Sequence, residues 1–512
     1  AMNRSVPAHA GSWLLDGQAG MSKEDDSPDY ELFLKFSGRK KILSERQLME
    51  TTKAVKKFGF ADKVGYMFGD FGNDFTFILS TMFLMKFYTD IMGISGGLVG
   101  VMMMLARFLD AFTDVAMGQI ADRSRPRAKG KFLPWIRRMS GPVAVASFLM
   151  YASWFQDMPM GFKIFWMFFT YLLWGSVFYT SINIPYGSMA SAISGDPKDR
   201  AELSNWRTIG ASLAGTVIGV VMPMVVYYTD EKGNQVLSGT KMAYAAFFCS
   251  VFAVVCYMLC YMLTTERVKV EQKTEKFNLR DLLAGLAHNR PLIGIILSSI
   301  CMLLAQLTLS GMAAYIYPNY FRNVRAQSAA GLVGTVITLV CSLFTVKLSQ
   351  KFGRKELGIA SALLSAAVLI FTFFLHTDNA WVFVGLFACT YIGLGIFSLI
   401  TWAMITDVID DTEVQTGERS DGTIYAVYSF ARKIGQAASA GLTGSLLTAI
   451  GYTKVTQFDE NVVNGIYNIT CLVPALGFVL LALALKFLYP LGKERVEKNA
   501  QILEQKRKKA DK

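Results

Sequence analysis

The chain has 512 residues, of which 53% are hydrophobic and 18% are charged, and its mean hydropathy is +0.35. This apolar composition excludes an ordinary soluble protein, because the apolar runs are long enough to cross a bilayer. The formal net charge is +12, but the basic residues fall in alternate loops, which excludes a nucleic-acid-binding patch.

Twelve apolar runs predict an all-α polytopic membrane protein. They cover about residues 60–88, 95–121, 134–156, 162–192, 203–228, 241–264, 291–318, 326–349, 356–376, 380–406, 422–450 and 465–489. The loops after most even-numbered runs are basic, so the positive-inside rule places these loops and both termini in the cytoplasm. We therefore expect a multi-pass protein of the inner or plasma membrane.

The longest stretch between runs separates them into six and six. The expected divisions are a cytoplasmic N-terminal segment 1–57, an N-terminal half 58–264, a cytoplasmic middle loop 265–290, a C-terminal half 291–490 and a basic cytoplasmic tail 491–512. Residues 1–20 precede Met21, and they are either an addition made during cloning or part of an alternative start.

Cysteine and histidine form no recognisable metal or redox pattern. All seven cysteines fall inside predicted spans, and none of the three histidines lies in the middle of a span. The sequence has no phosphate-binding loop, nucleophile elbow or zinc signature, so ATP-driven transport and covalent catalysis are unsupported. We expect no enzyme activity and no cofactor.

The first apolar run carries Asp70 and Asp74 four residues apart, which puts both carboxylates on one helix face. A carboxylate in hydrocarbon costs at least about 2.5 kcal/mol, so such groups usually face a polar cavity. We expect Asp74 to face this cavity. Asp70 lies nearer the start of the run, where it either lines the cavity and binds substrate or is solvated or salt-bridged.

The second run repeats this spacing with Asp110 and Asp114. Two carboxylates on one face repel each other when both are ionised, which favours protonation of one or binding of a cation. Arg107 lies three residues before Asp110, where it forms either a structural ion pair or part of a gate. Thr113 supplies a hydroxyl beside Asp114, and we expect these two residues and Asp110 to couple transport to a cation.

The fourth and fifth runs add polar groups to the same expected cavity. Thr180 offers a hydroxyl, Asn183 offers a carbonyl and an amide, and Pro185 can kink the helix that carries them. Arg207 is a fixed cation in the fifth run. Asn183 would either match sugar hydroxyls or complete an ion site, and Arg207 needs a carboxylate, the cavity or the membrane interface. Tyr186 could stack on a sugar ring, although a tyrosine in such a protein is more often part of the packing.

The tenth and eleventh runs carry an aromatic residue, an acidic stretch and a lysine. Trp402, about one and a half turns before the acidic stretch, could stack on a sugar ring. The acidic stretch is either a solvated loop or a cytoplasmic gate that pairs with basic loops. The expected gate residues are Asp407, Asp410, Glu413 and Arg419. We expect Lys433 to point toward the carboxylates of the other half.

Four stretches resemble the glycoside–pentoside–hexuronide:cation symporter family of the major facilitator superfamily. They are LARFLDAFTDVAMGQIADRSR, NIPYGSMASA, RAELSNWRTIGASLAG and TDVIDDTEVQTGERSDGTIYAVYSFARKIGQA, and the similarity covers about residues 58–490. The family fold has 12 transmembrane helices in two six-helix halves around a central cavity. The resemblance, to melibiose permease and more closely to the glucuronide permease, implies a sugar site at Asp74 and Arg207 and a cation site at Asp110, Asp114, Thr180 and Lys433.

This chain departs from melibiose permease at two positions of that cation site. Melibiose permease has an asparagine where this chain has Thr113 and an aspartate where it has Asn183. The loss of one carbonyl and one carboxylate weakens a sodium site more than it weakens a pair of protonatable carboxylates. We therefore expect proton-coupled symport of a glycoside, pentoside or hexuronide, with sodium at Asp110 and Asp114 as the alternative.

Two further functions stay open from the sequence. One is an amphipathic-lipid carrier of the same fold, and the other is a non-transporting membrane sensor. Arg207, Arg432 and Lys433 would suit an anionic hexuronide, or they are committed to structure. We expect a monomer whose partners are a small-molecule glycoside or hexuronide, the coupling cation and the lipid bilayer, with no nucleic acid.

Overall fold

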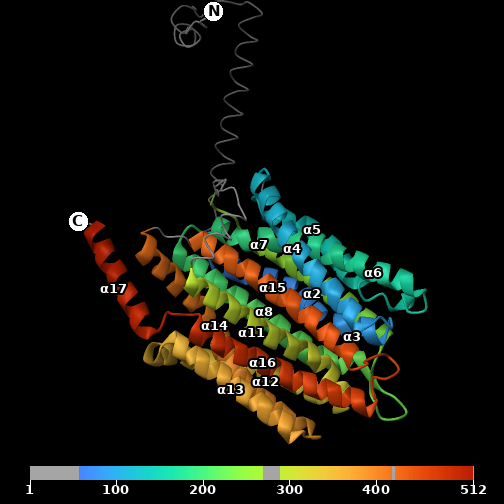
Figure 1. The fold of residues 1–512 in the computed structure, drawn as a ribbon. Coiled ribbons are helices and arrows are strands. Elements are labelled where there is room, and N and C mark those ends of the chain that lie inside the picture. The colour runs from blue at the N-terminus through green and yellow to red at the C-terminus, as the bar shows by residue number, and fades with distance from the viewer. Residues whose placement is uncertain (1–56, 128, 269–288, 418–420, 511–512) are drawn as a thin grey trace, which may run out of the picture. The chain divides into compact units, whose positions relative to one another are not determined.

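The computed structural model describes residues 57–127, 129–268, 289–417 and 421–510 (Figure 1). The chain divides into two units, residues 1–57 and 58–512, and every element named below belongs to the second. The predicted N-terminal segment and most of the predicted middle loop lie outside the described residues.

Six membrane-length helical segments form the first half, and π-helical turns interrupt two of them. In chain order the elements are α2 (Phe60–Leu79), η2 (Ser80–Leu84), α3 (Met85–Asp90), α4 (Gly96–Arg123), α5 (Leu133–Leu149), η3 (Ser153–Phe155), α6 (Met160–Leu172), η4 (Leu173–Tyr179), α7 (Thr180–Ile193), α8 (Pro197–Val226), β1 (Tyr227–Thr229), β2 (Gln235–Leu237) and α9 (Gly239–Leu263). The two short strands pair antiparallel, with Tyr227 opposite Leu237.

Six more segments form the second half, followed by a helical tail. They are α11 (Arg290–Tyr315), extended by the π-helical turn η5 (Ile316–Tyr320), then α12 (Val324–Phe352), α13 (Arg354–Leu375), α14 (Ala380–Thr416), α15 (Asp421–Ala449), α16 (Glu460–Phe487) and the tail α17 (Lys493–Ala510). These segments match the twelve predicted apolar runs.

Eight of the segments in the described part of the chain are long and apolar enough to cross a membrane. The other four are α5, which has 17 residues, and the three segments α2–α3, α4 and α15, whose interiors carry charged residues. The all-α prediction is confirmed for the described residues apart from the short β1–β2 hairpin.

Side-chain caps set the beginnings of several helices. The Asp196 carboxylate accepts a hydrogen bond from the Lys198 amide, next to Pro197 at the first position of α8. Asn289 and Asn323 accept equivalent amide hydrogen bonds at the starts of α11 and α12. These caps satisfy amide groups that have no partner inside the helix.

The part of the acidic stretch from Asp407 to Thr416 is helical and not a loop. α14 continues to Thr416, and Gly417, with a φ of +80°, ends it in the left-handed conformation that glycine adopts most easily. The sequence from Asp407 to Thr416 has no glycine or proline, so nothing interrupts the helix earlier. The acidic side chains therefore lie on a rigid helical end.

The two halves pack through α4 against α15 and through α8 against α12. We call the end where α4 finishes at Arg123 and α13 starts at Arg354 the basic end, and the end where α3 finishes at Asp90 and α12 starts at Val324 the opposite end. Near the opposite end, glycines allow the helices of the two halves to approach closely. A Cβ added at Gly100 would lie 2.7 Å from the Ala440 carbonyl oxygen.

The second contact between the halves is equally close. A Cβ added at Gly331 of α12 would lie 3.0 Å from the Gly219 carbonyl oxygen of α8. The Gly97 amide of α4 also donates a hydrogen bond to the Thr448 hydroxyl of α15, at 2.7 Å. The helices of the two halves are therefore in close contact at the opposite end.

Candidate functional site

A cavity of about 480 Å³ lies between the two halves. α2, α4, η4, α7 and α8 of the first half and α14 and α15 of the second supply its wall, whose residues are Asp70, Asp74, Phe77, Arg107, Asp110, Asp114, Tyr179, Thr180, Asn183, Arg207, Ala211, Trp402, Ser429, Arg432, Lys433 and Gln436. Asp114, Arg207 and Ser429 lie in the parts of their helices that are nearer the basic end. The cavity is therefore displaced toward that end.

The first charged pair in this cavity joins Asp70 to Arg207. The Arg207 Nε donates to the Asp70 carboxylate at 3.0 Å, across 137 residues of sequence. Tyr186 supports this pair from behind: its ring stacks on Tyr66, its hydroxyl donates to the Tyr66 carbonyl at 2.8 Å, and the Arg207 guanidinium lies 5.5 Å from its ring centre. Tyr186 is fully buried and does not line the cavity.

Asp74 lies in the cavity wall on the same helix face as Asp70. Among the described residues no side chain donates a hydrogen bond to its carboxylate or forms an ion pair with it. Asn183 also lines the cavity with its amide available. The cavity therefore presents one unpaired carboxylate and one amide, which are groups that bind sugar hydroxyls.

Asp110 is held by two partners. The Ser176 hydroxyl donates to one carboxylate oxygen at 2.6 Å, and Arg107 contacts the other at 3.3 Å. Ser176 lies in the π-helical turn η4, which widens the helix immediately before Thr180. Sequence reasoning missed Ser176; its position one helical turn before Thr180 was the available signal.

Asp114 forms an ion pair between the two halves. Lys433 of α15 forms an ion pair with one Asp114 oxygen, and the Thr180 hydroxyl donates to the other at 2.9 Å. Lys433 also approaches the Asp110 carbonyl oxygen at 3.3 Å. The predicted direction of Lys433 agrees with this geometry. The Thr113 hydroxyl instead donates to the Asp110 carbonyl of its own helix, at 3.3 Å, and does not line the cavity.

Trp402 and Arg432 form the aromatic side of the cavity. The Arg432 guanidinium lies 5.6 Å from the Trp402 ring centre and 5.9 Å from that of Tyr428. Within the described part of the chain, no carboxylate forms an ion pair with Arg432. Three cations of the cavity are paired with three carboxylates, so Arg432 and Asp74 are the two charged groups left over.

Of the predicted gate residues, Arg107 lines this cavity, whereas Asp407, Asp410 and Glu413 lie outside it, on the part of α14 at the basic end. Asp407 forms an ion pair with Arg354, the first residue of α13. The neighbouring Asp411 accepts hydrogen bonds from the Arg495 guanidinium of the tail helix at 2.9 Å. Both pairs join elements of the same half. Arg419 lies outside the described residues, and Asp410 and Glu413 lie on the same helical end as Asp407.

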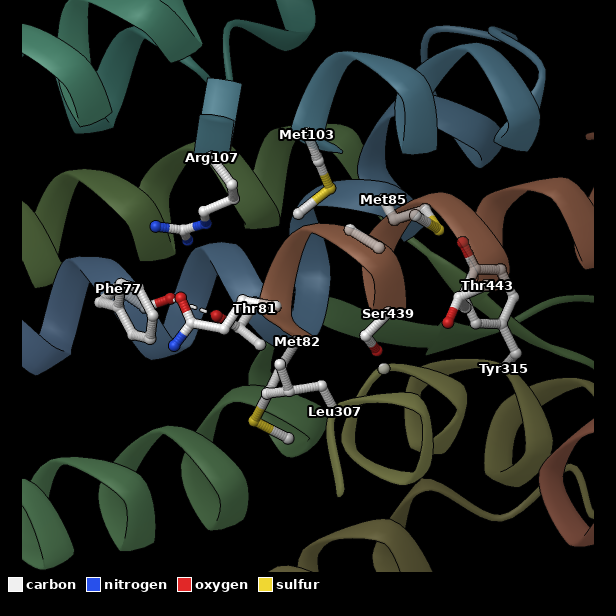
Figure 2. Close-up of a pocket in the computed structure, with 13 residues that line it drawn as sticks. Phe77, Thr81, Met82, Met85, Met103, Arg107, Leu307, Tyr315, Ser439 and Thr443 are labelled. Atoms are coloured by element: carbon white, nitrogen blue, oxygen red, sulfur yellow. Dashed lines mark hydrogen bonds between the residues drawn. The ribbon is translucent and has the colours of Figure 1, made fainter. Parts of the chain in front are cut away.

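A narrow extension, which we call the neck, continues the cavity toward the opposite end (Figure 2). It encloses about 50 Å³ and shares Phe77, Arg107 and Gln436 with the cavity wall. Figure 2 shows Met82, Met85 and Met103 gathered around it, with Ser439 and Thr443 of α15 facing them. No cluster of three or more histidine, cysteine or acidic residues suited to a metal ion occurs in the described residues.

Residues 65–493 match the model of a protein family described as MFS/sugar transport protein. The chain is 30% identical to the uncharacterized symporter YjmB of Bacillus subtilis (strain 168), over 89% of this chain and 98% of that protein. It is 28% identical to a glucuronide carrier protein homolog of Escherichia coli (strain K12), over 87% and 95%. It is 27% identical to an isoprimeverose transporter of Lactiplantibacillus pentosus, over 84% and 88%.

Solved structures show the same fold at lower identity. The nucleoside transporter NupG superposes with a TM-score of 0.60 at 14% identity, over 84% of this chain and 100% of that one. A D-xylose-proton symporter superposes with a TM-score of 0.60 at 13% identity, over 84% and 97%. At such identities the likeness is one of fold alone.

Proposed function

Because this chain belongs to the MFS/sugar transport protein family, we propose that it carries a glycoside or hexuronide into the cell together with a proton. Family membership and the superposed structures confirm the predicted major facilitator fold, and the protein is a multi-pass membrane transporter of the sugar-symporter type and not an enzyme. The substrate and the coupling ion are the parts of the proposal that the following geometry supports.

The two unpaired charged groups of the cavity support an anionic sugar. Asp74 accepts hydrogen bonds from sugar hydroxyls, and Asn183 adds a donor and an acceptor beside it. Arg432 offers a fixed positive charge to a carboxylate. Since these groups come from both halves, a hexuronide that contacts all of them holds the halves together around itself.

The observation that carries the coupling proposal is the ion pair between Asp114 and Lys433, which joins α4 to α15. A proton that binds Asp114 neutralises it and removes this electrostatic attraction between the halves. Thr113 supports a proton over sodium, because its hydroxyl donates to its own helix backbone and is not directed at the carboxylates.

Alternating access is the mechanism that fits these contacts. The basic end faces the cytoplasm by the positive-inside rule, so this structure, closed at the opposite end, is the inward-facing state. Substrate and proton bind from outside, the halves rock about the cavity, and both are released at the basic end. The protein works as a monomer in this scheme, because the whole site lies within one chain.

The test is uptake of labelled glucuronides and neutral glycosides into proteoliposomes under separately imposed proton and sodium gradients. We expect the proton gradient alone to drive accumulation. Asp114→Asn should abolish accumulation against a gradient while leaving exchange of internal for external substrate. Glu460→Gln is a matched control, since Glu460 is an exposed carboxylate at the start of α16, at the opposite end, and does not line the cavity.

The outcomes separate the alternatives. Accumulation driven by sodium alone would replace the proton with sodium at Asp110 and Asp114. Full accumulation by Asp114→Asn would remove this residue from the coupling mechanism. If no carbohydrate is transported under either gradient, the sugar assignment fails and an amphipathic lipid becomes the substrate to examine.

A further inference from the structure

A buried polar cluster closes the opposite end of the protein. The Lys86 ammonium of α3 forms an ion pair with Asp90 at 2.8 Å and donates to the Asn319 side-chain oxygen and to the Tyr452 hydroxyl, each at 2.6 Å. The Tyr452 hydroxyl in turn donates to Asp90 at 2.7 Å. Lys86 is 1% exposed and Asp90 is 3% exposed. None of the proposed substrate or proton contacts involves these residues.

The cluster contains residues of both halves. Lys86 and Asp90 belong to the first half, whereas Asn319 lies in η5 and Tyr452 follows α15 in the second. The Tyr315 ring of α11 also lies 4.6 Å below the Lys86 ammonium, and it lines the neck. The cluster therefore sits directly beyond the neck, between the cavity and the opposite surface.

We propose that Lys86, Asp90, Asn319 and Tyr452 form the outer lock of the transport cycle, closed here and broken whenever the protein opens outward. This inference rests on the alternating-access part of the proposed function but not on the identity of the substrate or the coupling ion. Its basis is that these residues join the two halves next to the neck, so the halves cannot separate there without parting Lys86 from Asn319 and Tyr452.

Both charged residues of the lock belong to the first half, and this allows the lock to open and close reversibly. A buried charge that loses its partner is strongly destabilising. Here the two charges, Lys86 and Asp90, lie four residues apart on one helix, so they stay paired when the halves separate. Only hydrogen bonds to neutral groups cross between the halves, and water can replace them on opening. The lock can therefore open without leaving a buried charge unpaired.

The same logic shows which substitutions are informative. Replacing Lys86 or Asp90 would leave the other charge buried and could unfold the protein. Tyr452→Phe removes two hydrogen bonds across the halves, the one from Lys86 and the one to Asp90, and Asn319→Ala removes one. Both variants leave the ion pair intact. Either variant should weaken the closed outer end relative to the outward-open state.

Access from outside can be measured with a cysteine in the neck. Gly311 lines the neck, and a Cβ added there has no neighbour within 4 Å, so Gly311→Cys is tolerated. A membrane-impermeant maleimide applied to right-side-out vesicles labels this cysteine only while the outer end is open. The same vesicles without Gly311→Cys give the background from the native cysteines. No substrate or ion gradient is needed, so a failure here is distinct from a failure of the proposed function.

We expect Tyr452→Phe and Asn319→Ala each to raise the labelling rate about tenfold, the factor that corresponds to about 1.4 kcal/mol. The matched control is Tyr467→Phe, because Tyr467 is equally buried and donates to the Thr372 carbonyl, at 2.7 Å, inside the second half alone. Its labelling rate should equal that of the parent.

Two results would overturn the proposal. One is an unchanged labelling rate in a lock variant that reaches the membrane in the parent's amount. The other is an equal rise in Tyr467→Phe, which would mean that any lost hydrogen bond loosens the protein. The two lock variants are independent, so if one fails to fold, the labelling rate of the other still tests the proposal.

Discussion

Replacing Arg432 with glutamine should separate anionic from neutral substrates. Arg432 is the cation of the cavity without a carboxylate partner among the described residues, so its charge is free for a substrate carboxylate. Hydrogen bonds to charged groups contribute about 1.5–3 kcal/mol, which corresponds to a loss of about 10- to 150-fold in affinity. Because Arg432 is partly exposed, the lower part of that range is expected.

The assay is exchange across proteoliposomes without any gradient, which reports binding and movement of the substrate apart from proton coupling. The half-saturating concentration of a glucuronide should rise about tenfold or more in Arg432→Gln. The half-saturating concentration of the matching neutral glucoside should change less than about threefold, since for this substrate only the contacts of Arg432 with Trp402 and Tyr428 are altered. Arg432→Lys should lie between, because lysine keeps the charge but loses the planar fork.

An equal loss for the glucuronide and the glucoside would refute this reasoning, since it would mean that Arg432 positions Trp402 and does not bind a carboxylate. An unchanged glucuronide affinity would show that the anion is held elsewhere in the cavity. In that case Arg207 would be the next residue to examine, although it already pairs with Asp70.

Two further predictions concern the framework of the site. Gly444→Ala places a methyl group 2.9 Å from the Gly100 Cα, and we expect it to lower the free energy of unfolding in detergent by about 1–3 kcal/mol. Gly385→Ala is the control, because a Cβ there has no neighbour within 4 Å. Equal melting temperatures of the two variants would contradict the close contact. Asp411→Ala removes both hydrogen bonds from Arg495, so we expect trypsin to cleave the tail α17 at a higher rate while transport activity is unchanged. An unchanged cleavage rate would show that other contacts hold the tail.

The acidic stretch illustrates where sequence reasoning was limited. Its charges and its position at the basic end were readable from the sequence, and pairing with a basic loop was one of the two interpretations. The structure extends α14 as far as Thr416 and pairs Asp407 with Arg354 in the same half. The roles of Asp407, Asp410, Glu413 and Arg419 as a gate remain predictions.

Local patterns determined much of this protein. Apolar runs of membrane length predicted the helices, and a four-residue spacing predicted that Asp110 and Asp114 share a face, because both features depend only on helix geometry. The same argument placed Asp74 at the cavity. The resemblance then assigned Arg207 to the sugar site and Lys433 to the cation site, which the helix pattern alone could not do.

Only the tertiary structure decided which charges are paired. Asp70 meets Arg207 across 137 residues, Tyr186 lies behind that pair, and Arg432 is left without a carboxylate in the described residues. The sequence analysis assigned no role to Lys86, because a lysine near the end of a span usually reaches water. Its burial depends on Asn319 and Tyr452, more than 230 residues away, and no local pattern encodes such a contact.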